Sequence, residues 1–154
     1  RPGEVSLAHL GVLFLDELPE FRRQALECLR EPLENQRITL SRAAWHVELE
    51  ADFQLIAAMN PCPCGFLGAA ERRCRCTPDQ VLRYQGRLSG PFLDRIDLHI
   101  EVPLIPAHEV LRAPPGEHSA LVQARCQQAR QRARDRQGCC NARLTAAQLQ
   151  DLPW

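Results

Sequence analysis

The chain has 154 residues, of which 45% are hydrophobic and 25% charged. This composition is typical of a globular protein and excludes a disordered chain. No apolar run approaches the ~20 residues of a membrane span, and no secretory signal opens the chain. We therefore expect a cytoplasmic protein without membrane contacts. In that compartment its eight cysteines are expected to be free thiols or metal ligands rather than disulfides.

The N-terminal part predicts a strand followed by a helix. The apolar run Leu10–Leu15 is too short for a helix and is typical of a strand buried on both faces of a parallel sheet. Asp16 and Glu17 follow this strand at its carboxyl end. From residue 20 onward, apolar side chains recur at helical spacing, and Pro32 is expected to kink or end that helix.

Two further patterns follow in the central part. Residues 37–50 alternate between apolar and polar side chains in two halves around Ala43 and Ala44, which predicts a β-hairpin. Residues 53–59 read as a second buried strand, ended by Asn60 and Pro61.

The remaining segments complete an α/β pattern. The expected elements are an irregular Cys-rich stretch over 62–76, a helix over 78–88, a short helix or turn over 89–95, a third strand over 96–102, a Pro-rich linker over 104–117, a helix over 118–137 closed by Gly138, and a helix beginning near 145. Alternating strands and helices favour a parallel sheet, in which ligands bind at the carboxyl ends of the strands.

Three polar positions carry candidate chemistry. Asp16 and Glu17 end an apolar strand in the manner of a Walker B motif, where one carboxylate holds Mg²⁺ and the second activates water; the alternative is a solvated acidic turn. Asn60 could reach a phosphate, or could be a simple Asn-Pro turn. Arg95 could neutralise charge in a transition state, or could be a surface residue paired with Asp94 or Asp97.

In this order the motifs resemble the magnesium-chelatase-like AAA+ ATPases, and in particular the ComM/YifB group. The stretches that carry the resemblance lie within residues 1–110 and are RPGEVSLAHLGVLFLDELPEF, REPLE, LSRA, FQLIAAMNPCPCG, CRCTPDQ and RYQGRLSGPFLDRIDLHIEVP. Each piece alone is common, but their combination is specific.

The resemblance implies a partial AAA+ P-loop-type core over 1–103 with a hairpin before sensor 1, the linker 104–117, and the first helices of an α-helical lid over 118–154. Asp16 would bind Mg-ATP, Glu17 would be the catalytic base, Asn60 would be sensor 1, and Arg95 would be an arginine finger acting on a neighbouring subunit. The intact protein would be a homo-oligomeric ring, a hexamer, that couples ATP hydrolysis to DNA remodelling or branch migration.

One departure from the family is decisive. The phosphate-binding motif G-x-x-x-x-G-K-[ST] needs a lysine, and the chain contains none. We therefore expect the phosphate loop to lie upstream of residue 1 and this chain to be inactive alone. Two rival interpretations remain: a magnesium-chelatase ATPase subunit, and a non-catalytic zinc-stabilised interaction module.

Four cysteines form a candidate metal site. Cys62, Cys64, Cys74 and Cys76 fall within fifteen residues that contain few apolar side chains, and four thiolates suit a closed, structural Zn²⁺ site. The alternative is a loop with free thiols. Cys28 lies near the apolar side of the predicted helix and is expected in the core.

The predicted hairpin tip is a candidate contact for nucleic acid. Arg42 and Trp45 flank this tip, and an aromatic ring beside a cation can stack on an unpaired base. The alternative is that Trp45 packs against a neighbouring strand or subunit.

Overall fold

The computed structural model describes residues 3–42, 45–69 and 72–150, without the side chains of 41–46 and 107. The chain divides into two compact units, Arg1–Pro106 and Ala107–Trp154. The first unit contains α1 (Glu4–Leu7), β1 (Val12–Leu15), η1 (Leu18–Glu20), α2 (Arg23–Glu27), α3 (Arg30–Asn35), β2 (Arg37–Arg42), β3 (Trp45–Glu50), β4 (Gln54–Ala57), α4 (Pro78–Gln85) and α5 (Gly90–Leu93).

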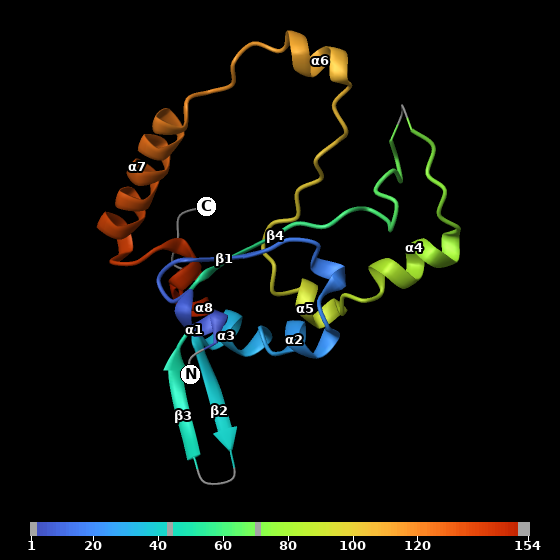
Figure 1. Ribbon diagram of the computed structural model, residues 1–154. Coiled ribbons are helices and arrows are strands. Elements are labelled where there is room, and N and C mark those ends of the chain that lie inside the picture. The colour runs from blue at the N-terminus through green and yellow to red at the C-terminus, as the bar shows by residue number, and fades with distance from the viewer. Residues whose placement is uncertain (1–2, 43–44, 70–71, 151–154) are drawn as a thin grey trace. The chain divides into compact units, whose positions relative to one another are not determined.

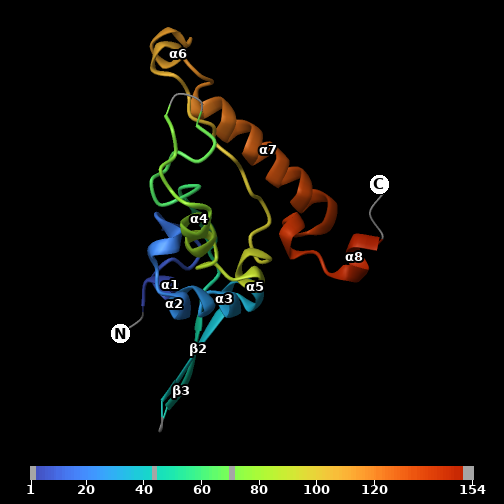
Figure 2. The same ribbon diagram turned by 90° about the vertical axis from the view of Figure 1, so that its right-hand side faces the viewer.

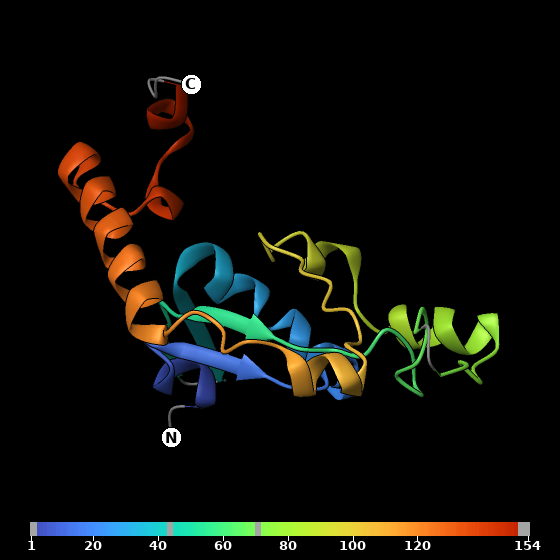
Figure 3. The ribbon, with the colours of Figure 1, turned by 90° about the horizontal axis from the view of Figure 1, so that it is seen from above.

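Strands β1 and β4 form a parallel pair, as the two apolar runs predict. Val12 is opposite Gln54 and Leu15 is opposite Ala57, and both arrows run in the same direction in Figure 3. Helices α2, α3 and α5 lie on one side of this pair (Figure 1). The buried core between them consists of Leu18, Leu26, Leu29, Leu88 and Phe92, against which Leu13, Leu15, Leu55 and Ala57 of the strands pack.

The strand pair is covered on one face only. The side chains of β1 and β4 alternate between exposed and half-buried, and Phe14 and Ile56 on the outer face are 59% and 44% exposed. The prediction that these strands are buried on both faces is therefore wrong for the described residues. A continuous apolar run indicates two covered faces, and here the helices supply one layer.

The predicted hairpin is confirmed. Strands β2 and β3 pair antiparallel, from Arg37 opposite Glu50 to Arg42 opposite Trp45. The hairpin projects away from the helices of this unit (Figure 2). At its base, the Thr39 hydroxyl donates a 2.7 Å hydrogen bond to Glu31 of α3, so the hairpin is fastened to the helix that precedes it.

The helix predicted from residue 20 is interrupted. It consists of η1, α2 and α3, with a first break at residues 21–22 and a second at Cys28 and Leu29. Pro32 lies inside α3, so the helix continues past it. Proline has no N–H with which to bond the carbonyl four residues earlier, which is that of Cys28, and the second break therefore precedes the proline by one turn. Cys28 is exposed rather than in the core.

The third strand predicted over 96–102 is not formed among the described residues. This segment has no regular structure, and Leu98, Ile100 and Val102 are 79%, 81% and 82% exposed. The sequence pattern is that of a strand, but a strand also needs a neighbour to hydrogen-bond with. No such neighbour lies beside it in the described part of the chain.

The second unit is helical. It contains α6 (Ala107–Arg112), α7 (Ser119–Gln137), η2 (Asn141–Arg143) and α8 (Ala146–Gln150). Gly138 ends α7 with a φ of 77°, as predicted. Helix α6 lies inside the stretch expected to be an irregular linker. Among the described residues, no helix is long and apolar enough to cross a membrane.

Candidate functional site

The carboxyl ends of β1 and β4 bring three of the predicted site residues to one edge. Backbone pairing continues beyond the strands: the Ala58 N–H donates to the Leu15 carbonyl, and the Leu18 N–H donates to the Ala58 carbonyl, both at 2.9 Å. Asp16 and Glu17 lie between these two hydrogen bonds, in the segment that follows β1. Asn60 comes two residues after Ala58, in the segment that follows β4, so the two carboxylates and the amide lie at the same edge of the strand pair.

The acidic pair sits on a sharp turn. Glu17 has a φ of 52°, a left-handed conformation that is rare for residues other than glycine. The Asp16 Oδ1 atom accepts a 2.8 Å hydrogen bond from the Glu17 N–H, which supports the turn. Both side chains are exposed. Their carboxylate oxygens are the ligands that Mg²⁺ prefers, so the donor set fits this ion.

Helix α4 packs against the segment that carries Asn60. The Gln85 Nε2 atom donates a 3.1 Å hydrogen bond to the Pro61 carbonyl. Tyr84 is buried, which raises the pKa of its hydroxyl, and the carboxylates of Glu20 and Glu17 raise it further, while a hydrogen bond from the Asn60 backbone acts in the opposite direction. Pro78 and Thr77 indicate where α4 begins, but not that its end contacts Asn60; this contact was missed by sequence reasoning.

Among the described residues, Arg95 forms no hydrogen bond or ion pair with Asp16, Glu17 or Asn60; its partner is on another helix. Its guanidinium, which follows α5, forms an ion pair with Glu34 of α3. The partner is therefore neither Asp94 nor Asp97, the two carboxylates considered from the sequence. The role of Arg95 as a finger stays a prediction. The side chains of Arg42 and Trp45 lie outside the described residues, so their predicted contact with DNA is not tested.

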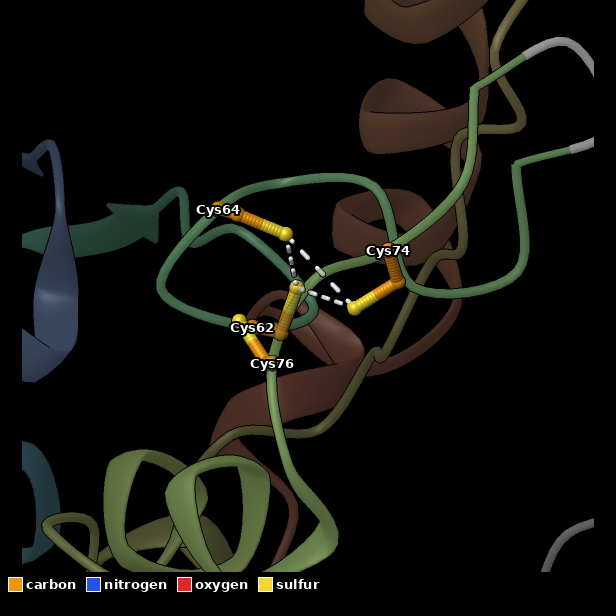
Figure 4. Close-up of side chains that lie close together, drawn as sticks. All are labelled: Cys62, Cys64, Cys74 and Cys76. Atoms are coloured by element: carbon orange, nitrogen blue, oxygen red, sulfur yellow. Dashed lines mark hydrogen bonds between the residues drawn. The ribbon is translucent and has the colours of Figure 1, made fainter.

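The four predicted metal ligands converge, and Figure 4 shows them together. The Sγ atoms of Cys62, Cys64 and Cys74 lie 3.4, 3.5 and 3.7 Å apart. All four Sγ atoms, including that of Cys76, lie within 4.8 Å of one another. A Zn–S distance of about 2.3 Å in a tetrahedron places sulfurs ~3.8 Å apart, so the arrangement fits Zn²⁺.

The four thiol groups differ in burial and in pKa. Cys62 is fully buried. Hydrogen bonds from the backbone of Arg75 and Phe66 lower the pKa of Cys64 to about 6, whereas burial raises the pKa of Cys76 to about 12. The two pKa values diverge because backbone N–H groups stabilise the Cys64 thiolate, whereas burial destabilises the Cys76 thiolate. A bound divalent cation would stabilise all four thiolates, which is the chemistry of a structural zinc site.

Comparison with known proteins finds several relatives of this chain. YifB of Escherichia coli, described as uncharacterized, is 52% identical over 152 residues, which cover 98% of this chain and 30% of YifB. The competence protein ComM of Haemophilus influenzae is 48% identical over 97% of this chain and 29% of ComM. The DNA replication licensing factor Mcm2 of Drosophila melanogaster is 31% identical over 62% of this chain and 10% of Mcm2.

The chain thus spans about 30% of the length of these first two relatives. Their identity extends over nearly the whole chain, which confirms the resemblance to the ComM/YifB group. The family profile described as "Magnesium chelatase, subunit ChlI" matches residues 1–110. On this match, the chain belongs to the magnesium chelatase subunit ChlI family.

Proposed function

We propose that this chain is the hydrolytic part of an ATP-driven ring motor that remodels DNA. The observation that carries the proposal is the shared edge of β1 and β4, where Asp16, Glu17 and Asn60 follow neighbouring parallel strands. Two carboxylates and an amide at that place are the groups that hydrolysis of a phosphoanhydride requires. Family membership and the similarity to ComM support the same conclusion.

Each residue has a separate task in this proposal. Asp16 would hold Mg²⁺, which would supply charge neutralisation on the phosphates when bound. Glu17 accepts the proton of the attacking water, and Asn60 orients that water or the terminal phosphate through its amide. Arg95 stabilises transition-state charge on the nucleotide of the adjacent subunit, which requires it to leave Glu34.

The four cysteines hold one structural Zn²⁺ ion in this proposal. Their Sγ geometry supports a closed tetrahedral site, and four protein thiolates leave no position for a substrate. The zinc then orders a loop that contributes one fully buried residue, Cys62. The hexameric ring, the lid formed by the second unit, and the action on DNA rest on the relatives.

A magnesium-chelatase ATPase subunit is the second candidate, and the description of the family profile favours it. The identity of 48–52% to ComM and YifB over nearly the whole chain weighs toward the DNA motor. Both candidates share the hydrolytic step, so they differ in what stimulates it. DNA stimulates the first, and a tetrapyrrole-inserting partner stimulates the second.

The test uses the intact protein. Glu17→Gln should retain nucleotide binding and abolish turnover, because an amide cannot accept the proton of water. Arg95→Ala should also abolish turnover. Mixed rings of the two variants should regain part of it, because the intact Arg95 of one subunit then faces the intact Glu17 of the next. Normal turnover in Glu17→Gln would refute the proposed function.

A further inference from the structure

The segment between β4 and α4 carries both Asn60 and the four-cysteine centre, and the two are close along the chain and in space. Cys62 comes two residues after Asn60 and is fully buried. Gly65, within the loop between the cysteines, has a φ of 80°, and a Cβ atom placed there would lie 3.8 Å from the Asn60 Oδ1 atom. The loop that carries Cys62 and Cys64 therefore folds back against the Asn60 amide.

The other half of the centre is tied to the same place through α4. Cys76 directly precedes Thr77, whose side chain accepts a hydrogen bond from the Gln80 N–H in a capping box that begins α4. At the far end of this helix, the Gln85 amide donates a hydrogen bond to the Pro61 carbonyl, and the buried Tyr84 lies beside the Asn60 backbone. Helix α4 thus spans from a metal ligand to Asn60.

We propose that Tyr84 and Gln85 are positioning residues that couple the geometry of the four-cysteine centre to Asn60, so that metal loading controls the hydrolytic step and not nucleotide binding. This inference rests on the proposed function. The chain enters the centre at Pro61, the neighbour of Asn60, and leaves it at Thr77, where α4 begins, and the far end of α4 contacts the Pro61 carbonyl. Asn60 is therefore held from two sides when the four sulfurs are held together.

The effect is expected on hydrolysis because of the role proposed for Asn60. Its amide acts on the attacking water or the terminal phosphate, whereas most binding contacts come from a phosphate loop that this chain, without lysine, does not supply. A displacement of about 1 Å in a positioning group can cost ~100-fold in rate. A centre without metal lets the two halves of the loop separate and allows such a displacement.

The first test is Tyr84→Phe in the intact protein, which removes one hydroxyl and keeps the ring. We expect turnover to fall about tenfold, while the dissociation constant for ATP and the zinc content per chain stay within about twofold. Gln85→Leu removes the hydrogen bond to the Pro61 carbonyl at an exposed position and should lower turnover by a smaller factor. This second variant keeps the test valid if Tyr84→Phe does not fold. Leu82→Ala, exposed on the same helix, is the matched control and should change neither quantity.

The second test removes the metal from the intact protein with a chelator and then restores it with Zn²⁺. Metal-free protein should bind ATP with unchanged affinity. It should lose its tighter binding of ADP with aluminium fluoride, an analogue of the transition state, relative to ATP, and should regain that binding when Zn²⁺ is restored. Unchanged turnover in both variants, or metal removal that weakens ATP binding as much as analogue binding, would overturn the inference. The proposed function fails separately, if Glu17→Gln still turns over.

Discussion

The exposed apolar segment 96–102 leads to a sharp prediction about the intact protein. Leu98, Ile100 and Val102 alternate with polar residues and are each about four-fifths exposed. An alternating pattern of this kind is typical of a strand with one covered face. We expect that, in the intact protein, a strand from outside this chain pairs with 96–102 and buries these side chains.

The perturbation is Ile100→Ala, and the structure sets its expected size. At 81% exposure the side chain loses almost no buried surface, so the isolated chain should lose less than about 0.5 kcal/mol of its free energy of unfolding. Once covered, the same truncation should cost about 2–5 kcal/mol. Phe92→Ala, at a fully buried position, should cost about 3–5 kcal/mol in both proteins.

The assay is the urea midpoint of each variant, measured in the isolated chain and in the intact protein. The prediction is a small effect of Ile100→Ala in the first and a large one in the second, with Phe92→Ala severe in both. If Ile100→Ala remains harmless in the intact protein while Phe92→Ala is severe, no strand covers this segment and the reasoning is wrong.

Three further predictions concern other parts of the chain. Cys74→Ser should lose the zinc, about one ion per chain by elemental analysis, and make residues 61–77 more susceptible to protease, whereas Cys126→Ser, at an exposed cysteine of α7, should keep the metal; equal zinc in both would exclude the site. The hydroxyl of Ser89 and the guanidinium of Arg30 lower the pKa of Glu27 below 4.5, so its stabilising effect is complete above that pH and is lost as the pH falls through the lowered value. The stability difference between wild type and Glu27→Gln, from urea midpoints, should therefore shrink from pH 7 to pH 3, and a constant difference would contradict this. In the assembled ring, Trp45→Ala should weaken binding of single-stranded DNA about tenfold through lost stacking, and Arg42→Ala should reduce its salt dependence by about one phosphate contact; a lower melting temperature with unchanged DNA affinity would show that Trp45 packs instead.

The elements that sequence reasoning predicted correctly are those with local signals. Two apolar runs became β1 and β4, the alternation around residues 43 and 44 became a hairpin, and Gly138 ended α7. The failures depend on distant partners. The segment 96–102 has the pattern of a strand without a described neighbour, and the exposed outer face of β1 lacks the second layer that its apolar run anticipates.

The candidate site divides in the same way. Asp16, Glu17 and Asn60 were predicted together because the carboxyl ends of adjacent parallel strands meet, and the four cysteines were predicted from their spacing. The contacts that support them were not predictable. Gln85 reaches Pro61 across 24 positions and Arg95 reaches Glu34 across 61. No local pattern specifies such pairs, because they depend on how α4 and α5 pack on the remainder of the unit.

The absence of lysine from the chain determines how all the site variants should behave. In the proposed function, the residues present here act on the water and on the charge that develops during bond cleavage, while the phosphate loop that would retain the nucleotide needs a lysine, which this chain does not contain. An interaction that is made only in the transition state lowers turnover when it is removed and leaves substrate affinity in place. Changes at Glu17, Asn60, Tyr84 and Arg95 should therefore share one kinetic signature, with turnover reduced and nucleotide affinity retained, although these residues lie on four different segments of the chain.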